Sequence, residues 1–260
     1  INFESDWKLI TIFIGGNDIC DHCQNTLLFS AENYVRHIRD SLDYLHKEVP
    51  RALVNLVEPL SVPPLRELHM DPSLKCPTWL LNFLCPCVIL PKSNSEALQK
   101  VEKLNRQYQR VLHDLVESSR YDTREDFTVV VQPFFREIIV PRLPDGRPDR
   151  SFFSADCFHL SQRAQTLMAR SLWNNMLEPL GNKTYTQDFT ANVSLKCPSK
   201  VDCTDFRWVR TQTPGLAVNR GCSTDLALCS IHSLYLVFAV HKLRPADITV
   251  VAALGDSVTV

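Results

Sequence analysis

The chain has 260 residues, of which 45% are hydrophobic and 22% are charged, so a folded globular core is expected rather than disorder. Its 28 basic and 29 acidic residues give a formal net charge of −1, which argues against nucleic acid as a partner. The length suits one large domain or two small ones.

Strands and helices are predicted to alternate along the first 180 residues. Buried strands are expected at 8–14, 51–60 and 126–135, and amphipathic helices at 30–49, 93–121 and 160–177. Ser30 is placed to cap the first of these helices. A proline- and cysteine-rich excursion from Pro63 to Cys87 is expected to be a stapled loop with a short helix. This βα alternation indicates an α/β fold, with a parallel sheet flanked by helices on both faces.

The regular pattern stops after Gly181. Residues 182–246 contain four cysteines and several prolines, and are predicted to form an irregular linker. Within them, the 15 apolar-rich residues 226–240 fall short of the ~18 expected for a membrane span, so buried helix, strand and linker all remain open. A β-branched strand is expected to begin at Ile248.

Ten cysteines are many for a cytosolic protein. A single Cys-x-x-Cys pair, Cys20 and Cys23, has no His-x3–5-His partner, so disulfides are favoured over zinc. We expect a local bridge between those two cysteines, and a bridge from Cys76 to Cys85 or Cys87 that staples the excursion.

Other features also favour an oxidising, extracellular environment. Asn182 and Asn192 begin glycosylation acceptor triplets. The first residues lack a basic and then apolar leader, so the start of a secreted-type chain is expected to lie upstream of Ile1.

Three short motifs follow predicted strands or precede a predicted helix. Gly15-Gly16-Asn17-Asp18 ends the first strand, where Asn17 could donate to a developing negative charge, although the motif taken alone favours a simple turn. Asp156 and His159 could form a carboxylate–imidazole pair, or Asp156 could simply cap a helix. Gly255-Asp256-Ser257 follows the last strand, where Ser257 could be a nucleophile or a helix cap.

Together, "ITVVAALGDS", "KLITIFIGGND" and "SADCFHLS" resemble the SGNH (GDSL-type) hydrolases, and specifically the membrane-associated phospholipase B family. The resemblance implies a three-layer, flavodoxin-like SGNH hydrolase fold, acyl-serine chemistry on phospholipids and lysophospholipids, and no metal or other cofactor. It assigns Ser257 as the nucleophile, His159 as the general base, Asp156 as the carboxylate that orients the base, and Asn17 to the oxyanion hole. The glycine of the family's second block has no counterpart in this chain.

In the family the serine block comes first, whereas here it comes last. Circular permutation would need a βαβ unit of ~30 residues between Ser257 and Asn17, and only 3 residues follow Ser257 and 16 precede Asn17. We therefore expect a window across tandem repeats: 1–181 as the later part of one hydrolase repeat with its first strands missing, 182–246 as a linker, and 247–260 as the first strand of the next repeat. In that case the strand before Ser257 would pair in a different sheet.

Such a window would be inactive alone, since it lacks an oxyanion donor and its own nucleophile. The alternatives are a non-catalytic repeat that supports the folding or secretion of an active neighbour, and a carbohydrate esterase of the same fold. The expected partners are a phospholipid or lysophospholipid and the neighbouring repeats. The expected location is the extracellular side of the plasma membrane or the secreted fraction, with any membrane anchor outside this chain.

Overall fold

The computed structural model describes residues 2–191, 193–196, 243 and 247–256. Within these residues the helices are α1 (Gly16–Asp21), α2 (Ala31–Glu48), α3 (Glu67–Met70), α4 (Thr78–Leu84), α5 (Pro86–Ile89), α6 (Glu96–Glu117) and α7 (Gln162–Met176). Short 3₁₀ turns lie at Pro63–Arg66, Pro72–Leu74 and Arg150–Phe152. The strands are β1 (Trp7–Phe13), β2 (Ala52–Val57), β3 (Phe127–Gln132), β4 (Glu137–Ile139), β5 (Thr186–Asp188) and β6 (Ile248–Gly255).

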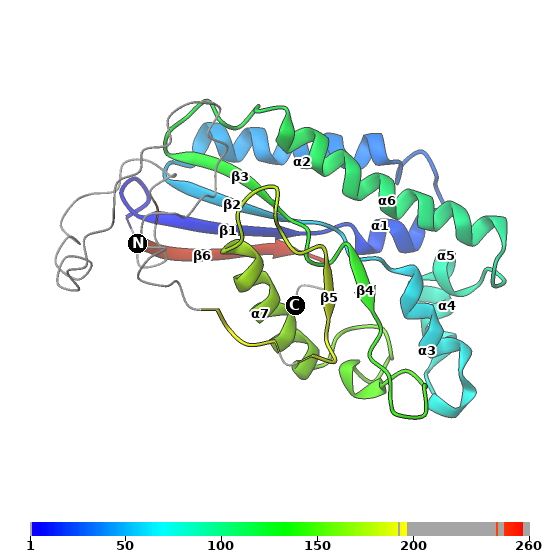
Figure 1. The fold of residues 1–260 in the computed structure, drawn as a ribbon. Coiled ribbons are helices and arrows are strands. Elements are labelled where there is room, and N and C mark those ends of the chain that lie inside the picture. Colours follow the sequence, from blue (N-terminus) through cyan, green and yellow to red (C-terminus); the bar gives the residue numbers. More distant parts are fainter. Residues whose placement is uncertain (1, 192, 197–242, 244–246, 257–260) are drawn as a thin grey trace.

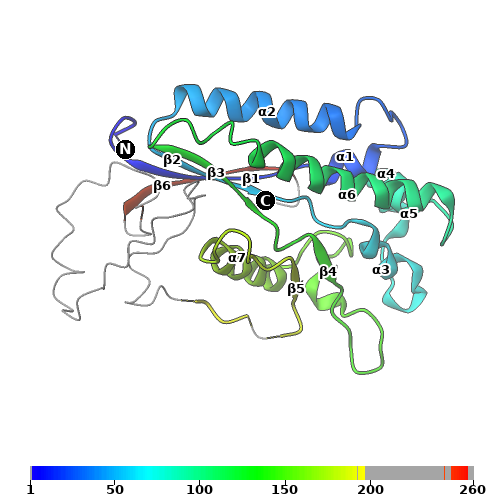
Figure 2. The same cartoon turned by 45° about the horizontal axis from the view of Figure 1, so that its top comes forward.

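The main sheet has the order β3-β2-β1-β6, and every neighbouring pair is parallel (Figure 1). Helices α2 and α6 pack together on one face, and α7 lies on the other (Figures 1 and 2). The expected parallel sheet with helices on both faces is confirmed. The three long predicted helices agree with α2, α6 and α7 to within a few residues, and Ser30 caps α2 by accepting from the amide of Asn33.

The alternation of side chains along the strands explains why both faces need cover. Ile10 and Ile12 of β1 belong to the large core beneath α2 and α6. Trp7 and Leu9, one position out of phase with them, belong to a smaller core that also contains Met176 of α7. A strand that is apolar on both faces is stable only between two layers.

Strand β6 lies beside β1 in this sheet, with Leu9 paired to Val251 and Phe13 to Gly255. The expectation that this strand pairs in a different sheet is therefore wrong for this structure. The physical reason is that the edge of β1 presents N–H and C=O groups that any strand of matching pattern can pair with. β6 is nevertheless poorly covered, since Val251 is 71% exposed and Leu254 is 54% exposed.

The expectation of disulfides is confirmed, but the expected pairings are wrong. Cys20 bonds to Cys85 and Cys23 bonds to Cys87. Because α1 packs against α5, Cys20 and Cys23 bond to cysteines of the α5 region and not to each other. The third bridge joins Cys76 to Cys157, a residue of the Asp156–His159 loop.

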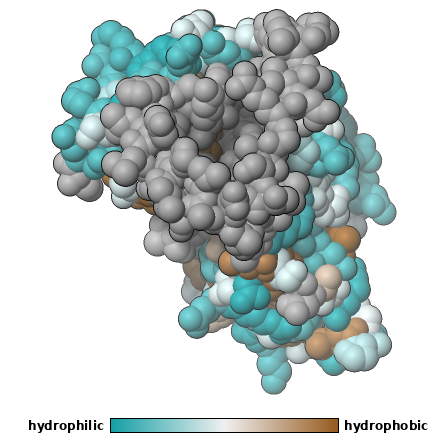
Figure 3. Space-filling view, turned by 60° about the vertical axis from the view of Figure 1, so that its left-hand side comes forward, coloured by the Kyte–Doolittle hydropathy of each residue, from teal (hydrophilic) through white to brown (hydrophobic). Residues whose placement is uncertain are grey.

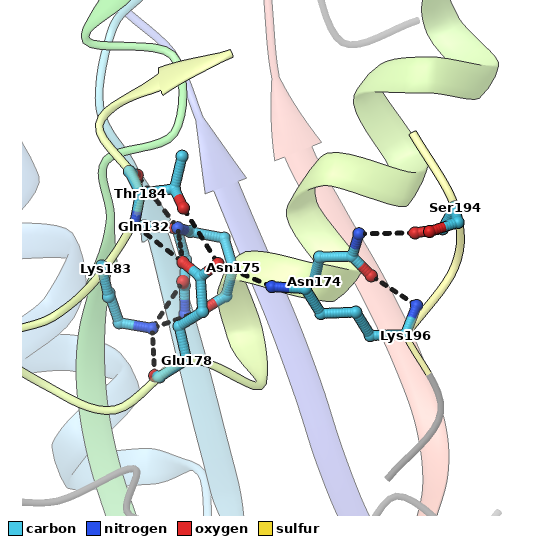
Figure 4. Close-up of polar contacts among 8 residues, drawn as sticks. All are labelled: Gln132, Asn174, Asn175, Glu178, Lys183, Thr184, Ser194 and Lys196. Carbon is cyan, nitrogen blue, oxygen red and sulfur yellow. Dashed lines mark hydrogen bonds and ion pairs between the residues drawn. The ribbon is translucent and has the colours of Figure 1, made fainter. Parts of the chain in front are cut away.

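The chain after Gly181 is more ordered than expected where it is described. β5 pairs in parallel with β4, and the buried amine of Lys183 donates to the Gln132 side chain and the Asn175 carbonyl (Figure 4). Burial lowers the pKa of Lys183 to about 8. Glu178 accepts from Thr184 and Lys196, so this segment is fastened to the end of α7. The apolar stretch 226–240 lies outside the described residues.

The face of the molecule drawn in Figure 3 has both hydrophilic and hydrophobic residues. In Figure 3 the coloured residues at the upper left are mostly hydrophilic, and small hydrophobic patches lie among hydrophilic residues lower down. Among the described residues, no helix combines the length and the apolar character needed to cross a membrane.

One fully buried charge lies just past the end of β2. The carboxylate of Glu58 accepts two hydrogen bonds from Arg136, at 2.9 and 2.7 Å, and also pairs with His113. Burial alone would raise the pKa of Glu58, but these partners outweigh it and hold the pKa below the ordinary value of 4.5. The cluster joins the loop after β2 to the loop after β3 and to α6.

We predict that Arg136→Met destabilises the fold by ~3–5 kcal/mol, because it leaves the buried Glu58 carboxylate without its main partner. Arg142→Met is the matched control, since its pair with Glu67 is about half exposed and should be worth at most ~1 kcal/mol. Chemical denaturation measures both. The Glu58 contribution should be present above pH 4.5 and should be lost as the pH falls through the lower folded pKa. Equal losses of stability in the two variants would contradict the role assigned to the buried Glu58 carboxylate.

Candidate active site

The first element of the site is the turn at the end of β1. Gly15 has φ +120°, and a Cβ there would lie 3.0 Å from the Tyr34 ring, so only glycine fits without strain. The Tyr34 hydroxyl donates to the carbonyl of Ile14, which fixes the end of the strand. α1 begins at once with Gly16, and this places the exposed Asn17 in the first helical turn at the carboxyl end of the sheet.

The Gly255-Asp256 end of β6 meets this turn. A single carboxylate oxygen of Asp256 accepts from the amides of Gly15, Gly16 and Asn17, at 3.2, 3.0 and 3.4 Å. Burial, and then the charge of Asp256, raises the pKa of Asp18. The parallel register of β1 and β6 thus brings two of the three sequence motifs to the same edge. Ser257, the next residue, lies outside the described residues.

The third motif forms the expected carboxylate–imidazole pair. Asp156 Oδ2 lies 2.6 Å from His159 Nδ1, while Oδ1 accepts from the Ser154 hydroxyl and from the amides of Phe158 and His159. Burial opposes ionisation, but these hydrogen bonds outweigh it and lower the pKa of Asp156 from 3.8 to about 2. An ionised carboxylate at Nδ1 leaves Nε2 as the ring nitrogen that can take a proton from a nucleophile.

The loop that carries this pair is braced covalently. Cys157, between Asp156 and His159, has φ +59° and is bonded to Cys76. A positive φ is unfavourable for a residue with a side chain, so the turn depends on the contacts around it. The disulfide and the hydrogen bonds to Asp156 supply those contacts.

An apolar pocket links the two halves of the site. Its walls include Gly16 and Asn17 from the β1 turn, and Phe158 and Leu160, which flank His159. The room inside it for the centre of a water-sized sphere is about 20 Å³, so the pocket is narrow in this structure. The rest of the lining is apolar side chains from other parts of the chain: Leu60, Val62, Leu65, Phe135, Ile138, Pro141, Phe152, Phe153, Ala164 and Phe189. Such a pocket suits a hydrocarbon chain with a polar reacting group at one end.

Sequence reasoning therefore located the polar residues but missed the walls of the pocket. Asn17 lines the cavity, and Phe158 and Leu160 bring the Asp156–His159 loop to it. The lining residues belong to no motif. In the sequence, isolated apolar residues in connecting segments cannot be distinguished from residues of the hydrophobic core. Asn182 is exposed, and Asn192 lies outside the described residues. Among the described residues, no group of three or more His, Cys, Asp or Glu side chains could hold a metal ion.

The hydrogen bonds to Asp156 can be tested directly. We predict that a ¹³C NMR titration finds the Asp156 carboxyl pKa near 2, and that Ser154→Ala raises it because one donor to the carboxylate is lost. Ser151→Ala, in the same loop, should leave it unchanged. The stability that Asp156 contributes should be present above pH 3.8 and should fall as the pH approaches 2. An unaltered pKa in Ser154→Ala would show that the hydroxyl does not hold the carboxylate ionised.

Comparisons with known proteins agree with this geometry. The chain is 47% identical over 259 residues to the human protein "Phospholipase B1, membrane-associated", and 46% identical to the protein of the same name from Rattus norvegicus. These matches cover 100% of this chain but only 17% of the length of either relative. No solved structure matches the chain significantly. Residues 2–172 match the family described as GDSL-like Lipase/Acylhydrolase, and the chain belongs to this family.

Proposed function

We propose that this chain is part of a serine ester hydrolase, and that the complete enzyme cleaves acyl chains from phospholipids and lysophospholipids. The single observation that carries the proposal is one apolar pocket lined both by Asn17 and by Phe158 and Leu160, which flank His159 of the Asp156–His159 pair. The similarity to proteins named phospholipase B1 supports the choice of substrate.

The residues divide the chemistry as follows. The Nε2 atom of His159 takes the proton of a serine hydroxyl as the oxygen attacks the ester carbonyl, and Asp156 stabilises the imidazolium that forms. The Asn17 side chain donates to the oxyanion, and the pocket receives the acyl chain. His159 then returns the proton to the leaving alcohol. Water repeats the sequence on the acyl-serine and releases the fatty acid. These steps need no metal or cofactor.

We propose that the serine is the one at the position of Ser257, at the end of the strand that lies beside β1. In this chain that strand is β6, and the close contact of Asp256 with the Asn17 turn supports the placement. We assign residues 1–181 to one repeat, 182–246 to the connection and 247–260 to the next repeat. In a longer protein, the repeat that contains residues 1–181 would have its own first strand upstream of Ile1. That strand would lie beside β1, where β6 lies here, and would carry the nucleophilic serine at the position equivalent to Ser257.

The exposure of β6 supports the same assignment. Val251 and Leu254 are apolar and more than half exposed, although strands of a parallel sheet are normally covered on both faces. The relatives are about six times longer than this chain, so further elements are available to cover it. We infer that the 260-residue chain alone has little activity. We also propose an extracellular location, with glycans on Asn182 and Asn192.

Variants should separate the roles of these residues. In a chain extended upstream to a complete repeat, we expect Asn17→Ala to lower kcat by about 10²–10³-fold, and Asp156→Asn to lower it by about 10⁴-fold through the wrong imidazole tautomer. His159→Ala should be comparably damaging. Hydrolysis of lysophosphatidylcholine measures each, and exposed Tyr44→Ala is the control.

Ser257→Ala tests the assignment of repeats. It should leave the extended chain almost unchanged, because the nucleophile would then be an upstream serine, and the 260-residue chain should hydrolyse an aryl ester only weakly. If the 260-residue chain is active and Ser257→Ala abolishes that activity, the nucleophile acts in cis and the repeat boundaries are wrong. If the extended chain is inactive while a neighbouring repeat hydrolyses the lipid, the chain is a non-catalytic repeat. Preference for acetylated sugars would favour a carbohydrate esterase.

The pocket predicts acyl-chain selectivity. Ile138 is half-buried and lines the pocket, whereas its neighbour Ile139 is 47% exposed and does not. We expect Ile138→Trp to lower kcat/KM for a long-chain ester at least about tenfold, since a missing methylene in a pocket is worth roughly 10–200-fold. Activity on an acetyl ester of the same alcohol should change little, and Ile139→Trp should affect neither. A loss shared equally by both esters would exclude this pocket as the acyl site.

A further inference from the structure

The helix α4 presents an apolar face to solvent. Trp79 is 75% exposed and Phe83 is 80% exposed, and they lie one helical turn apart on the same side. Leu84 and Leu90, at the ends of α4 and α5, are 44% and 61% exposed. A surface helix is normally apolar on its inner face and polar outside. Here Leu81 is completely buried on the inner face, and the outer face is also apolar.

This surface, made of Trp79, Phe83, Leu84 and Leu90, is held rigidly. The disulfides Cys76–Cys157 and Cys20–Cys85 fasten the chain just before and just after α4. The buried guanidinium of Arg66 donates to the carbonyls of Val88 and Pro91, at 2.8 and 2.7 Å, and this anchors the segment that carries Leu90. The apolar side chains are thus kept outward, since the backbone that bears them is fixed at both ends.

The charges around the surface favour one kind of partner. Residues 72–95 contain no Asp or Glu, and their only charged residues are Lys75 and Lys92, both exposed. The surface therefore has cations on its rim and no anions in its own segment. Tryptophan and phenylalanine beside lysine are the residues that bind the boundary between the lipid headgroups and the acyl chains. A protein partner would more often be matched by charges of both signs.

The position of the surface relates it to the pocket. Figures 1 and 2 both place α3, α4 and α5 beyond the carboxyl ends of β1 and β2, where the candidate active site lies. Leu60, Val62 and Leu65, which line the pocket, belong to the same stretch of chain that continues into α3 and α4. The bridge from Cys76 to Cys157 also connects this stretch to the loop of His159.

We propose that the surface of Trp79, Phe83, Leu84 and Leu90 docks on a lipid bilayer, with Lys75 and Lys92 contacting anionic headgroups. This deepens the proposed function and rests on it for the identity of the lipid: docking at this end would bring the pocket to the layer from which the acyl chain enters. The side chains would enter the boundary region of one leaflet without crossing it.

The experiment measures binding, so it does not depend on catalysis. The disulfide-intact chain is sedimented with phosphatidylcholine vesicles, with and without phosphatidylserine. Trp79→Ser/Phe83→Ser should lower the partition coefficient at least tenfold on both vesicles. Lys75→Gln/Lys92→Gln should lower it only on the anionic vesicles, and only at low salt. The matched control is Tyr44→Ser, since Tyr44 is 67% exposed on α2, near the turn leading to the amino end of β2.

Lipid contact by Trp79 gives an independent readout. Vesicles with quenchers on the acyl chains should quench the tryptophan emission of the parent chain, and Trp79→Phe should remove most of that quenching while binding persists. The proposal is overturned if the parent chain does not sediment with either vesicle, or if the double serine variant sediments as well as the parent. It is also overturned if the surface is instead buried against another part of a longer chain. If a chain extended upstream to a complete repeat binds the vesicles but hydrolyses no lipid ester, the proposed function is refuted and the docking surface stands.

Discussion

The structure depends on β1 having a partner strand on each edge and a helical layer on each face. β2 and β6 both run parallel to it, so the three carboxyl ends lie together and the loops that leave them share one edge of the sheet. The register brings Asp256 to the turn that holds Gly15 and Asn17, from a strand more than 200 residues further along the chain. In an open parallel sheet this edge is where a ligand site forms. Without the pairing of β1 and β6, Asp256 would have no reason to lie beside Asn17.

The other half of the site reaches this edge by a different route. Asp156 and His159 lie on an irregular loop, and such loops are positioned by specific contacts rather than by a hydrogen-bond ladder. The Cys76–Cys157 disulfide ties the loop to the segment before α4. The Asp156 carboxylate also accepts hydrogen bonds from two backbone amides of its own loop. Glu58 and Arg136 join the ends of β2 and β3, which carry the walls of the pocket. The Asp156–His159 pair is therefore held by a disulfide and by hydrogen bonds, and the Asn17 turn by the sheet.

The sequence predicts the parts of this molecule whose signal is local. Periodicity placed β1, β2, β3, α2, α6 and α7, because burial of one or both faces imposes a repeat on the residues themselves. The partner of Cys20 could not be predicted, since it is 65 residues away and depends on how α1 packs against α5. The strand at Ile248 was recognised, but its neighbour was not, because a strand's pattern says nothing about which sheet it joins. The pocket could not be predicted either, because its walls come from separate segments that only the fold brings together.

This division between local and assembled features has a consequence for function. A carboxylate, an imidazole, an asparagine and a serine can be read from three short motifs, and together they indicate a reaction class, acyl transfer through a serine. The same residues would serve a sugar ester as well as a lipid ester, because none of them contacts the part of the substrate that differs. The part of the substrate that differs, the acyl group or the sugar, would contact pocket residues that belong to no motif and lie on separate segments: Leu60, Ile138, Phe153 and Phe189. Substrate choice can therefore change by substitution in those segments while the Asp156–His159 pair is preserved. For this reason the motifs indicate the chemistry, and the proposal of a lipid substrate rests on the apolar lining of the pocket.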